Sequence, residues 1–222
     1  LNLTGARILT SMNLVLIPTR FEFDRLDSLA KLVQQRGWAM EVCGFGPIAA
    51  AACTAKRIAE LRPEQVILVG LAGSLDEQLK IGSAYEFSEV VCYGVGIGSG
   101  SQFQGLERLQ WLQDGDGQGI PRGDAIALGG EEDRQLLTCC AGSADFNEAA
   151  TKRQAFPKAT AEEMEGFGVA LACGMHGVPL RVVRGISNHA GDRHKNRWQI
   201  APALQAAGYL ASQIMESTSG VH

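Results

Sequence analysis

The residues from Gln65 to Gly70 read QVILVG, a nearly continuous run of aliphatic side chains. A strand with apolar side chains on both faces has to be covered on both faces, which is typical of strands inside a parallel sheet. Asn13 to Pro18 and Leu180 to Ser187 also read as strands, and segments with helical spacing of apolar residues lie between the strands. This alternation predicts an α/β protein in which helices cover a central sheet.

The remaining elements are predicted from apolar periodicity and from turn residues. The run Gly44-Phe45-Gly46-Pro47 predicts a tight turn whose proline begins a helix. The segment from Tyr93 to Asp124 is rich in glycine and lacks the G-x-G-x-x-G spacing of a dinucleotide loop, so we interpret it as a long flexible loop. Whether residues 94–124 close over a ligand stays open. The other predicted helices are Phe21 to Arg36, Ile48 to Leu61, Phe146 to Phe156, Gly166 to His176 and Trp198 to Met215, and the other predicted strands are Trp38 to Cys43, Ala125 to Leu128 and Leu136 to Cys140.

The composition limits the class of protein. A chain of 222 residues with 45% hydrophobic and 20% charged residues is typical of one globular core, so we expect a single domain over residues 12–222 and an extension over residues 1–11. The net charge of -4 argues against nucleic-acid binding and favours a small-molecule partner. No apolar run approaches the roughly 20 residues that span a bilayer, and no signal sequence is evident, which predicts a cytoplasmic protein with no membrane partner. The six cysteines form no C-x-x-C pair, so no metal, cofactor or disulfide framework is expected.

Polar residues and glycines cluster near the ends of several predicted strands, where open α/β sheets bind ligands at the carboxyl edge. Each has an ordinary structural explanation when it is taken alone. Glu22 suits the positive end of a helix, Ala72 and Gly73 suit a turn, and Asn188 suits a helix cap. The segments of interest are Thr19 to Glu22, Leu71 to Ser74, Glu163 to Glu165, and Ser187 with Asn188.

Glu163 and Glu165 are two residues apart, a spacing that places both side chains on one side of an extended chain. In a helix the same two side chains would point in nearly opposite directions. Carboxylate oxygens only accept hydrogen bonds, which suits the neighbouring hydroxyls of a ribose. The alternative is an exposed acidic run, because Glu162 precedes the pair.

The order of these segments resembles a known family. The run VILVGLAGSLDEQLKIGSAYEFSEV resembles the nucleoside phosphorylase and nucleosidase superfamily, and GFGPIAAAACTAKRIAE looks like its Gly-x-Gly-x-x-x-Ala segment. The run from Phe156 to Asn188 is similar to the Glu-Met-Glu helix entry and the Arg-x-Ile-Ser-Asp/Asn strand of 5′-methylthioadenosine/S-adenosylhomocysteine nucleosidases. The resemblance covers most of Asn13 to Ile214. It implies a single-domain, three-layer α/β/α fold with a mixed central sheet, nucleoside phosphorylase-like, and a homo-oligomer that binds a purine nucleoside.

The resemblance also implies roles for individual residues. It assigns Glu22 as the acid/base that activates water. It implies that Glu165, with Glu163 beside it, binds the ribose hydroxyls. The residues expected to contact the rest of the nucleoside are Met164 at the sugar, the backbone of Ala72 and Gly73 at the purine, and Arg184, Ser187 and Asn188 at the base end.

Asn188 stands where the adenine-cleaving nucleosidases have Asp. A carboxamide always carries both a donor and an acceptor, so its amino group suits the O6 atom of a 6-oxopurine. The run ISNHAGDRHKNRWQIAPAL resembles futalosine hydrolases, which implies release of hypoxanthine from futalosine in menaquinone biosynthesis. One basic residue of this run would then meet the carboxylate of the futalosine tail, or the run is a solvated charged loop. The candidates are Arg193, His194, Lys195 and Arg197.

Two further questions concern the reaction. The first strand ends Ile17-Pro18-Thr19-Arg20 and lacks the Gly-Asp-Pro of a phosphate loop, which favours water over phosphate as the nucleophile, although Arg20 leaves phosphate open. The alternatives to futalosine are methylthioadenosine, S-adenosylhomocysteine and aminodeoxyfutalosine, from which adenine would be released. A protein that binds nucleosides without catalysis is the third alternative, and Glu22 and Glu165 argue against it.

Overall fold

The computed structural model describes residues 12–109 and 123–218. The predicted extension over residues 1–11 and part of the predicted glycine-rich loop lie outside the described residues. The strands are β1 Leu14–Ile17, β2 Ala39–Val42, β3 Val66–Ser74, β4 Ala84–Phe87, β5 Glu89–Tyr93, β6 Gly96–Ile97, β7 Gln104–Gly105, β8 Ala125–Ala127, β9 Gln135–Cys139, β10 Ala159–Glu163 and β11 Leu180–His189. The helices are α1 Arg20–Phe23, α2 Asp27–Gln35, α3 Pro47–Leu61, α4 Leu106–Leu109, α5 Phe146–Ala155, α6 Gly166–His176 and α7 Ile200–Thr218, with short 3-10 turns η1 Gly100–Gln102 and η2 Lys195–Arg197.

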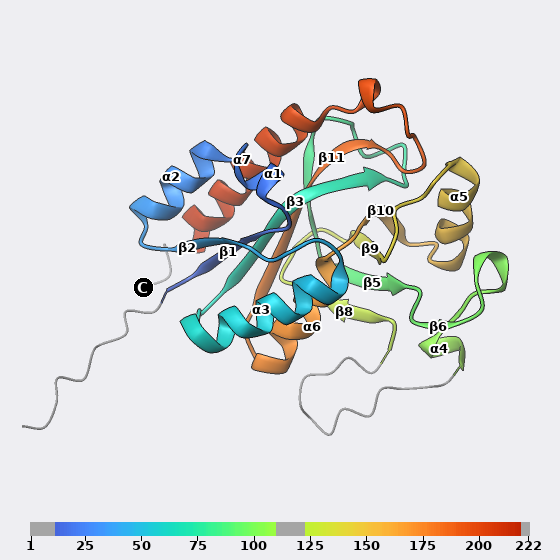
Figure 1. Ribbon diagram of the computed structural model, residues 1–222, viewed down its shortest axis with the longest axis horizontal. Coiled ribbons are helices and arrows are strands. Elements are labelled where there is room, and N and C mark those ends of the chain that lie inside the picture. The colour runs from blue at the N-terminus through green and yellow to red at the C-terminus, as the bar shows by residue number, and fades with distance from the viewer. Residues whose placement is uncertain (1–11, 110–122, 219–222) are drawn as a thin grey trace, which may run out of the picture.

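The central sheet is mixed, as the resemblance implied. Its main path runs β2-β1-β3-β10-β9-β5-β8, and β11 pairs with both β3 and β4. Strands β1, β2, β3 and β11 are parallel to one another, whereas β10 is antiparallel to β3. Helices α2 and α7 lie on one face of the sheet, and α3 and α6 lie on the other (Figure 1). The predicted three-layer α/β/α fold is confirmed.

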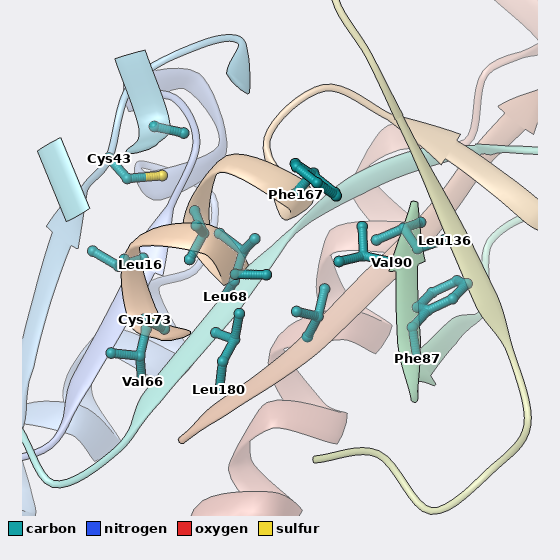
Figure 2. Packing of buried hydrophobic residues seen from close by; sticks show 14 of the residues in the cluster. Leu16, Cys43, Val66, Leu68, Phe87, Val90, Leu136, Phe167, Cys173 and Leu180 are labelled. Carbon is teal, nitrogen blue, oxygen red and sulfur yellow. The ribbon is translucent and has the colours of Figure 1, made fainter. Parts of the chain in front are cut away.

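The alternation of side chains along the inner strands builds the two cores. Leu14 and Leu16 of β1 pack into the cluster that includes α3 and α6, together with Leu68 of β3 (Figure 2). Val15 and Ile17 face the other way and pack with residues of α2 and α7. The apolar runs of the sequence therefore mark strands that are buried on both faces.

The predicted helix from Phe21 to Arg36 is two helices. The chain leaves helical geometry at Leu26, whose φ and ψ are -114° and 36°. In one continuous helix, Glu22 and Leu26 would lie on the same face, because they are four residues apart. Leu26 is buried in the apolar cluster beneath α2 and α7, whereas Glu22 contacts polar groups at the end of β1. The break lets these two side chains reach different surroundings.

Several elements were not predicted, and the predicted loop from Tyr93 to Asp124 contains short regular pieces in its described part. Strands β4, β5 and β10 were missed. The sequence of β10, ATAEE, has no apolar run of the kind that indicates an inner strand. The loop includes the pair β6 and β7, the turn η1 and the helix α4. Within the described ranges, no helix is both long and apolar enough to cross a membrane, and no cluster of three or more His, Cys, Asp or Glu side chains could hold a metal.

Helices α3 and α6 approach closely at Gly168. A Cβ atom at this position would overlap the carbonyl oxygen of Pro47, at the start of α3. We expect Gly168→Ala to lower the free energy of unfolding by about 1–3 kcal/mol, because the helices must separate to admit the methyl group. The exposed Gly174 on the same helix is a matched control, and Gly174→Ala should raise the free energy of unfolding by roughly 0.5–1 kcal/mol. Urea titration of both variants measures the difference, and equal stabilisation would show that the contact is loose.

Candidate active site

The site lies where strands β1 and β10 both end along one edge of β3. Strand β11 pairs with β3 from Val66 to Ser74, so it occupies one edge. On the other edge, β1 pairs as far as Leu68, and β10 arrives from the opposite direction and pairs at Gly73 and Ser74. Between Leu68 and Gly73, that edge of β3 has no strand partner within the described ranges. Backbone groups in this gap are free to bond to side chains.

Glu22 fills part of this gap. Its Oε1 accepts a hydrogen bond from the backbone N–H of Leu71 at 3.0 Å, and its Oε2 accepts one from the hydroxyl of Thr19 at 2.6 Å. Thr19 is also the N-cap of α1, because its Oγ1 accepts from the N–H of Glu22 at 3.2 Å. The side chain is buried. Both oxygens of this carboxylate are therefore held in place at the end of β1.

The carboxylate of Glu163 caps the N-terminal end of helix α6. Its carboxylate accepts hydrogen bonds from the backbone N–H groups of Glu165 and Gly166, at 2.8 Å each, and from the hydroxyl of Thr138. The first N–H groups of a helix have no partner inside the helix. A carboxylate here accepts hydrogen bonds from them and interacts favourably with the positive end of the helix dipole. Glu163 also pairs with Arg184. Its oxygens are largely occupied by these contacts.

Arg184 lies beneath the two carboxylates. It is fully buried, pairs with Glu163, and places Nη2 at 3.5 Å from Oε2 of Glu165. In the sheet it is aligned with Gly70 of β3, and a Cβ atom at Gly70 would overlap Nη1 of the guanidinium. A glycine within a strand often marks such a close approach. The missing side chain at Gly70 is what gives Arg184 room to reach the carboxylates.

Glu165 is the N-cap residue of α6 and turns towards the cavity. Its Oε1 accepts a hydrogen bond from the N–H of Gly46 at 3.0 Å. Burial raises the pKa of Glu165 to about 7, the charge of Glu163 also raises it, and Arg184 opposes both effects. The charge of Glu22 raises the same pKa to a smaller extent, so the two carboxylates are close enough to interact. Glu165 therefore titrates near neutral pH.

Most of the candidate residues line one cavity of about 260 Å³. Arg184 is the exception, since it lies behind the wall formed by Glu163 and Glu165. At the other end of the cavity, Asn188 donates from Nδ2 to the carbonyl of His189 at 2.8 Å and accepts from the Ser187 hydroxyl at 2.7 Å. The predicted site residues that line the cavity are Glu22, Ala72, Gly73, Glu163, Met164, Glu165, Ser187 and Asn188.

The cavity also contains residues that were not predicted. Phe45 contributes through an exposed ring and carries no local signal of function. Leu71, in the segment of interest Leu71 to Ser74, contributes through its backbone N–H. The alternative of an exposed acidic run is wrong, because Glu162, Glu163 and Glu165 are all buried. Of the charged run after β11, Arg193 lines the cavity together with Trp198.

Comparisons with known proteins identify relatives of this chain. The sequence profile described as the Phosphorylase superfamily matches residues 32–217. Futalosine hydrolase of Streptomyces coelicolor is 30% identical over 179 residues, which is 77% of this chain and 75% of the relative. A 5′-methylthioadenosine/S-adenosylhomocysteine nucleosidase of Lysinibacillus sphaericus is 28% identical over 162 residues, 67% of this chain and 66% of the relative. The solved structure of futalosine hydrolase of Helicobacter pylori superposes with a TM-score of 0.74 at 18% identity and covers 94% of this chain and 99% of its own.

Both sequence relatives have names that describe cleavage of a nucleoside by water, and the solved structure supports the same fold. The match over residues 32–217 spans most of the chain, including every candidate site residue except Glu22. The chain therefore belongs to the phosphorylase superfamily, and it is an enzyme of the N-glycosyl hydrolase type.

Proposed function

We propose that the enzyme hydrolyses the N-glycosidic bond of futalosine and releases hypoxanthine, a 6-oxopurine. The observation that carries the proposal is that Glu22, Glu165 and Asn188 line one cavity. These residues match three needs of the reaction, namely a base for water, an acceptor for ribose hydroxyls and an amide for the leaving purine. The S. coelicolor relative supports futalosine as the substrate.

In the proposed reaction, the C1′–N9 bond breaks while the sugar develops positive charge. Water adds to C1′ and gives its proton to Glu22, which passes it on to solvent. The leaving base takes up one proton at N7 from solvent, so that the OH of water ends on the sugar and its H is balanced by the one on the base. Glu165 accepts hydrogen bonds from the ribose hydroxyls and stabilises the positive sugar through its charge. Glu163 and Arg184 are positioning residues, because their contacts hold Glu165 at the start of α6.

Asn188 is proposed to bind the base. The carbonyl of His189 requires a donor, so it fixes the amino group of Asn188 on that side, and the Ser187 hydroxyl bonds to the amide oxygen. One N–H and one lone pair of the amide are then left for the base. The N–H suits O6 of hypoxanthine, and the lone pair suits a protonated N7. This pattern supports a 6-oxopurine.

Arg193 is proposed to meet the carboxylate of the futalosine tail. It lines the cavity, and its guanidinium lies 5.6 Å from the centre of the Trp198 ring. Arg197, in contrast, is 3.7 Å from the carboxylate of Asp192 and is not a lining residue. Arg193 is therefore the strongest of the four basic candidates, since it alone combines a place at the cavity with an aromatic support.

We also propose that the active enzyme is a homo-oligomer. Phe45 lines the cavity with 66% of its surface exposed, and Ile48, at the start of α3, is 81% exposed. Large apolar side chains with so much exposed surface are typical of faces that another molecule covers. A second copy of the chain would cover them and shield the sugar from bulk water.

The raised pKa of Glu165 predicts a pH dependence. If ribose binding needs the ionised carboxylate, kcat/KM falls as the pH drops through about 7, by roughly tenfold for each further pH unit. Unfolding does not explain such a loss, because a carboxyl whose pKa is higher in the folded state than in the unfolded state stabilises the fold as the pH falls. Measuring kcat/KM against pH tests this, and Glu165→Gln should remove the titration near pH 7. A flat profile for the unchanged enzyme would contradict the role of Glu165.

The decisive experiment offers futalosine, inosine and methylthioadenosine to the enzyme, with and without phosphate, and identifies the released bases and sugars. The proposal expects hypoxanthine from futalosine in the absence of phosphate. Adenine from methylthioadenosine as the main product would favour the second candidate, a nucleosidase like the L. sphaericus relative. Reaction only in the presence of phosphate would show that water is the wrong nucleophile.

A further inference from the structure

Glu162 is a buried carboxylate at the base end of the cavity, and no role in the proposed reaction uses it. It is aligned with Gly73 of β3, and Gly73 is aligned on its other side with Asn188 of β11. The three residues thus lie side by side on neighbouring strands. All three line the cavity, as does Gly142, which stands close to Oε1 of Glu162. Glu162 and Asn188 are therefore placed at the same end of the site, on either side of Gly73.

The surroundings of Glu162 hold its carboxylate in one orientation. Oε1 accepts from the backbone N–H of Ser143 at 2.8 Å, and Oε2 accepts from the Ser143 hydroxyl at 2.6 Å. Nζ of Lys152 lies 3.4 Å from Oε2 and donates to the carbonyl of Ala141 at 2.8 Å. Lys152 is 1% exposed, so an ammonium group is buried against this carboxylate. Within the described residues, every contact of the two Glu162 oxygens is therefore with a donor group, so both oxygens act as acceptors.

An ionised carboxylate can only accept hydrogen bonds. A 6-oxopurine carries a proton on N1, whereas N1 of adenine is itself an acceptor. A carboxylate that faces this edge of the base therefore attracts a 6-oxopurine and repels adenine. The backbone N–H of Ser143, which could have served adenine as a donor, is already bonded to Glu162.

We propose that Glu162 accepts a hydrogen bond from N1–H of the departing base and, together with Asn188 at O6 and N7, makes the site selective for 6-oxopurines. The inference rests on the proposed function, since it assigns one more contact to the same base. It adds a specificity residue on the opposite side of Gly73 from Asn188. Lys152 is then a positioning residue, which holds the Glu162 carboxylate in place.

The test measures the binding of free hypoxanthine and free adenine by calorimetry, which does not depend on hydrolysis. Glu162→Gln keeps the shape of the side chain and offers an N–H to N1 of adenine. We expect the preference for hypoxanthine over adenine to fall by roughly 10- to 100-fold, because a hydrogen bond to a charged group is lost and a new one to adenine is gained. Glu86→Gln is the matched control, because Glu86 pairs with Arg181 outside the cavity, and it should leave the preference unchanged.

An unchanged preference in Glu162→Gln, or equal binding of the two bases by the unchanged enzyme, would overturn the inference. A failure to hydrolyse futalosine despite selective binding of hypoxanthine would instead contradict the proposed function and leave the role of Glu162 intact.

If the Glu162→Gln protein does not fold, the unchanged enzyme still decides the matter. Hypoxanthine methylated at N1 has lost the proton, whereas hypoxanthine methylated at C2 keeps it and adds the same bulk to a neighbouring atom. The inference expects the N1-methyl base to bind at least about tenfold more weakly than the C2-methyl base. Equal affinities for the two bases would overturn it.

Discussion

We expect the Glu22→Gln variant to turn over its nucleoside about 10² to 10⁴ times more slowly than the unchanged enzyme, with nearly the same substrate affinity. The carboxamide has almost the shape of the carboxylate and still accepts from the N–H of Leu71 through its oxygen. It cannot take a proton from water. The loss should therefore fall on kcat, since the proposed substrate contacts of Glu165 and Asn188 are untouched.

Single-turnover measurement of base release, with substrate binding measured separately, checks this result. Asp24→Asn is the matched control, because it removes the same charge two residues away. Asp24 is exposed and pairs only across the surface with Arg20, at 3.7 Å. The control should retain full activity. Activity of Glu22→Gln equal to that of the control would show that another group activates water.

Removal of the Arg184 guanidinium is the second large effect. Arg184→Met leaves Glu163 and Glu165 buried beside each other without a cation, and we expect the free energy of unfolding to fall by about 3–5 kcal/mol. Burial of Arg184 costs folding free energy, because its Nε and Nη1 atoms have no hydrogen-bond partner within residues 12–109 and 123–218. Stability alone does not favour such an arrangement. Its contacts with both glutamates favour a role in positioning Glu165, the proposed ribose acceptor, and in lowering the pKa of its carboxyl group.

Denaturant unfolding measures the stability of Arg184→Met, and Arg181→Met on the same strand is the control. Arg181 makes a two-point ion pair with Glu86, and both side chains keep some exposure to water, 21% and 14%. Loss of this pair should therefore cost less stability than loss of the fully buried Arg184. A second readout separates positioning from simple support of the fold. Arg184 lowers the pKa of Glu165, so the variant should require a higher pH for the same kcat/KM. A pH profile that does not move would limit Arg184 to a structural role.

Much of the fold followed from local patterns. The buried strands β1, β3 and β11 were predicted from their apolar runs, and α6 was predicted with its observed bounds. The missed strand β10 has two glutamates in five residues, because its last two residues lie at the polar site, whereas Ala159 and Ala161 are buried in the apolar clusters. Patterns of hydrophobicity detect burial against apolar surroundings, and they are silent where a strand is buried against charge.

The sequence, by its patterns and its resemblance to a family, indicated the layers of the fold and eight of the cavity residues, including Glu22, Glu165 and Asn188. Only the tertiary structure decided which partners each carboxylate has. The extended pair inferred for Glu163 and Glu165 is interrupted, because β10 ends at Glu163 and α6 begins after Glu165. The two carboxylates consequently have different partners, the helix N–H groups and Arg184 for one, and the distant Gly46 for the other. Such contacts join residues far apart in the chain, and local spacing cannot encode them.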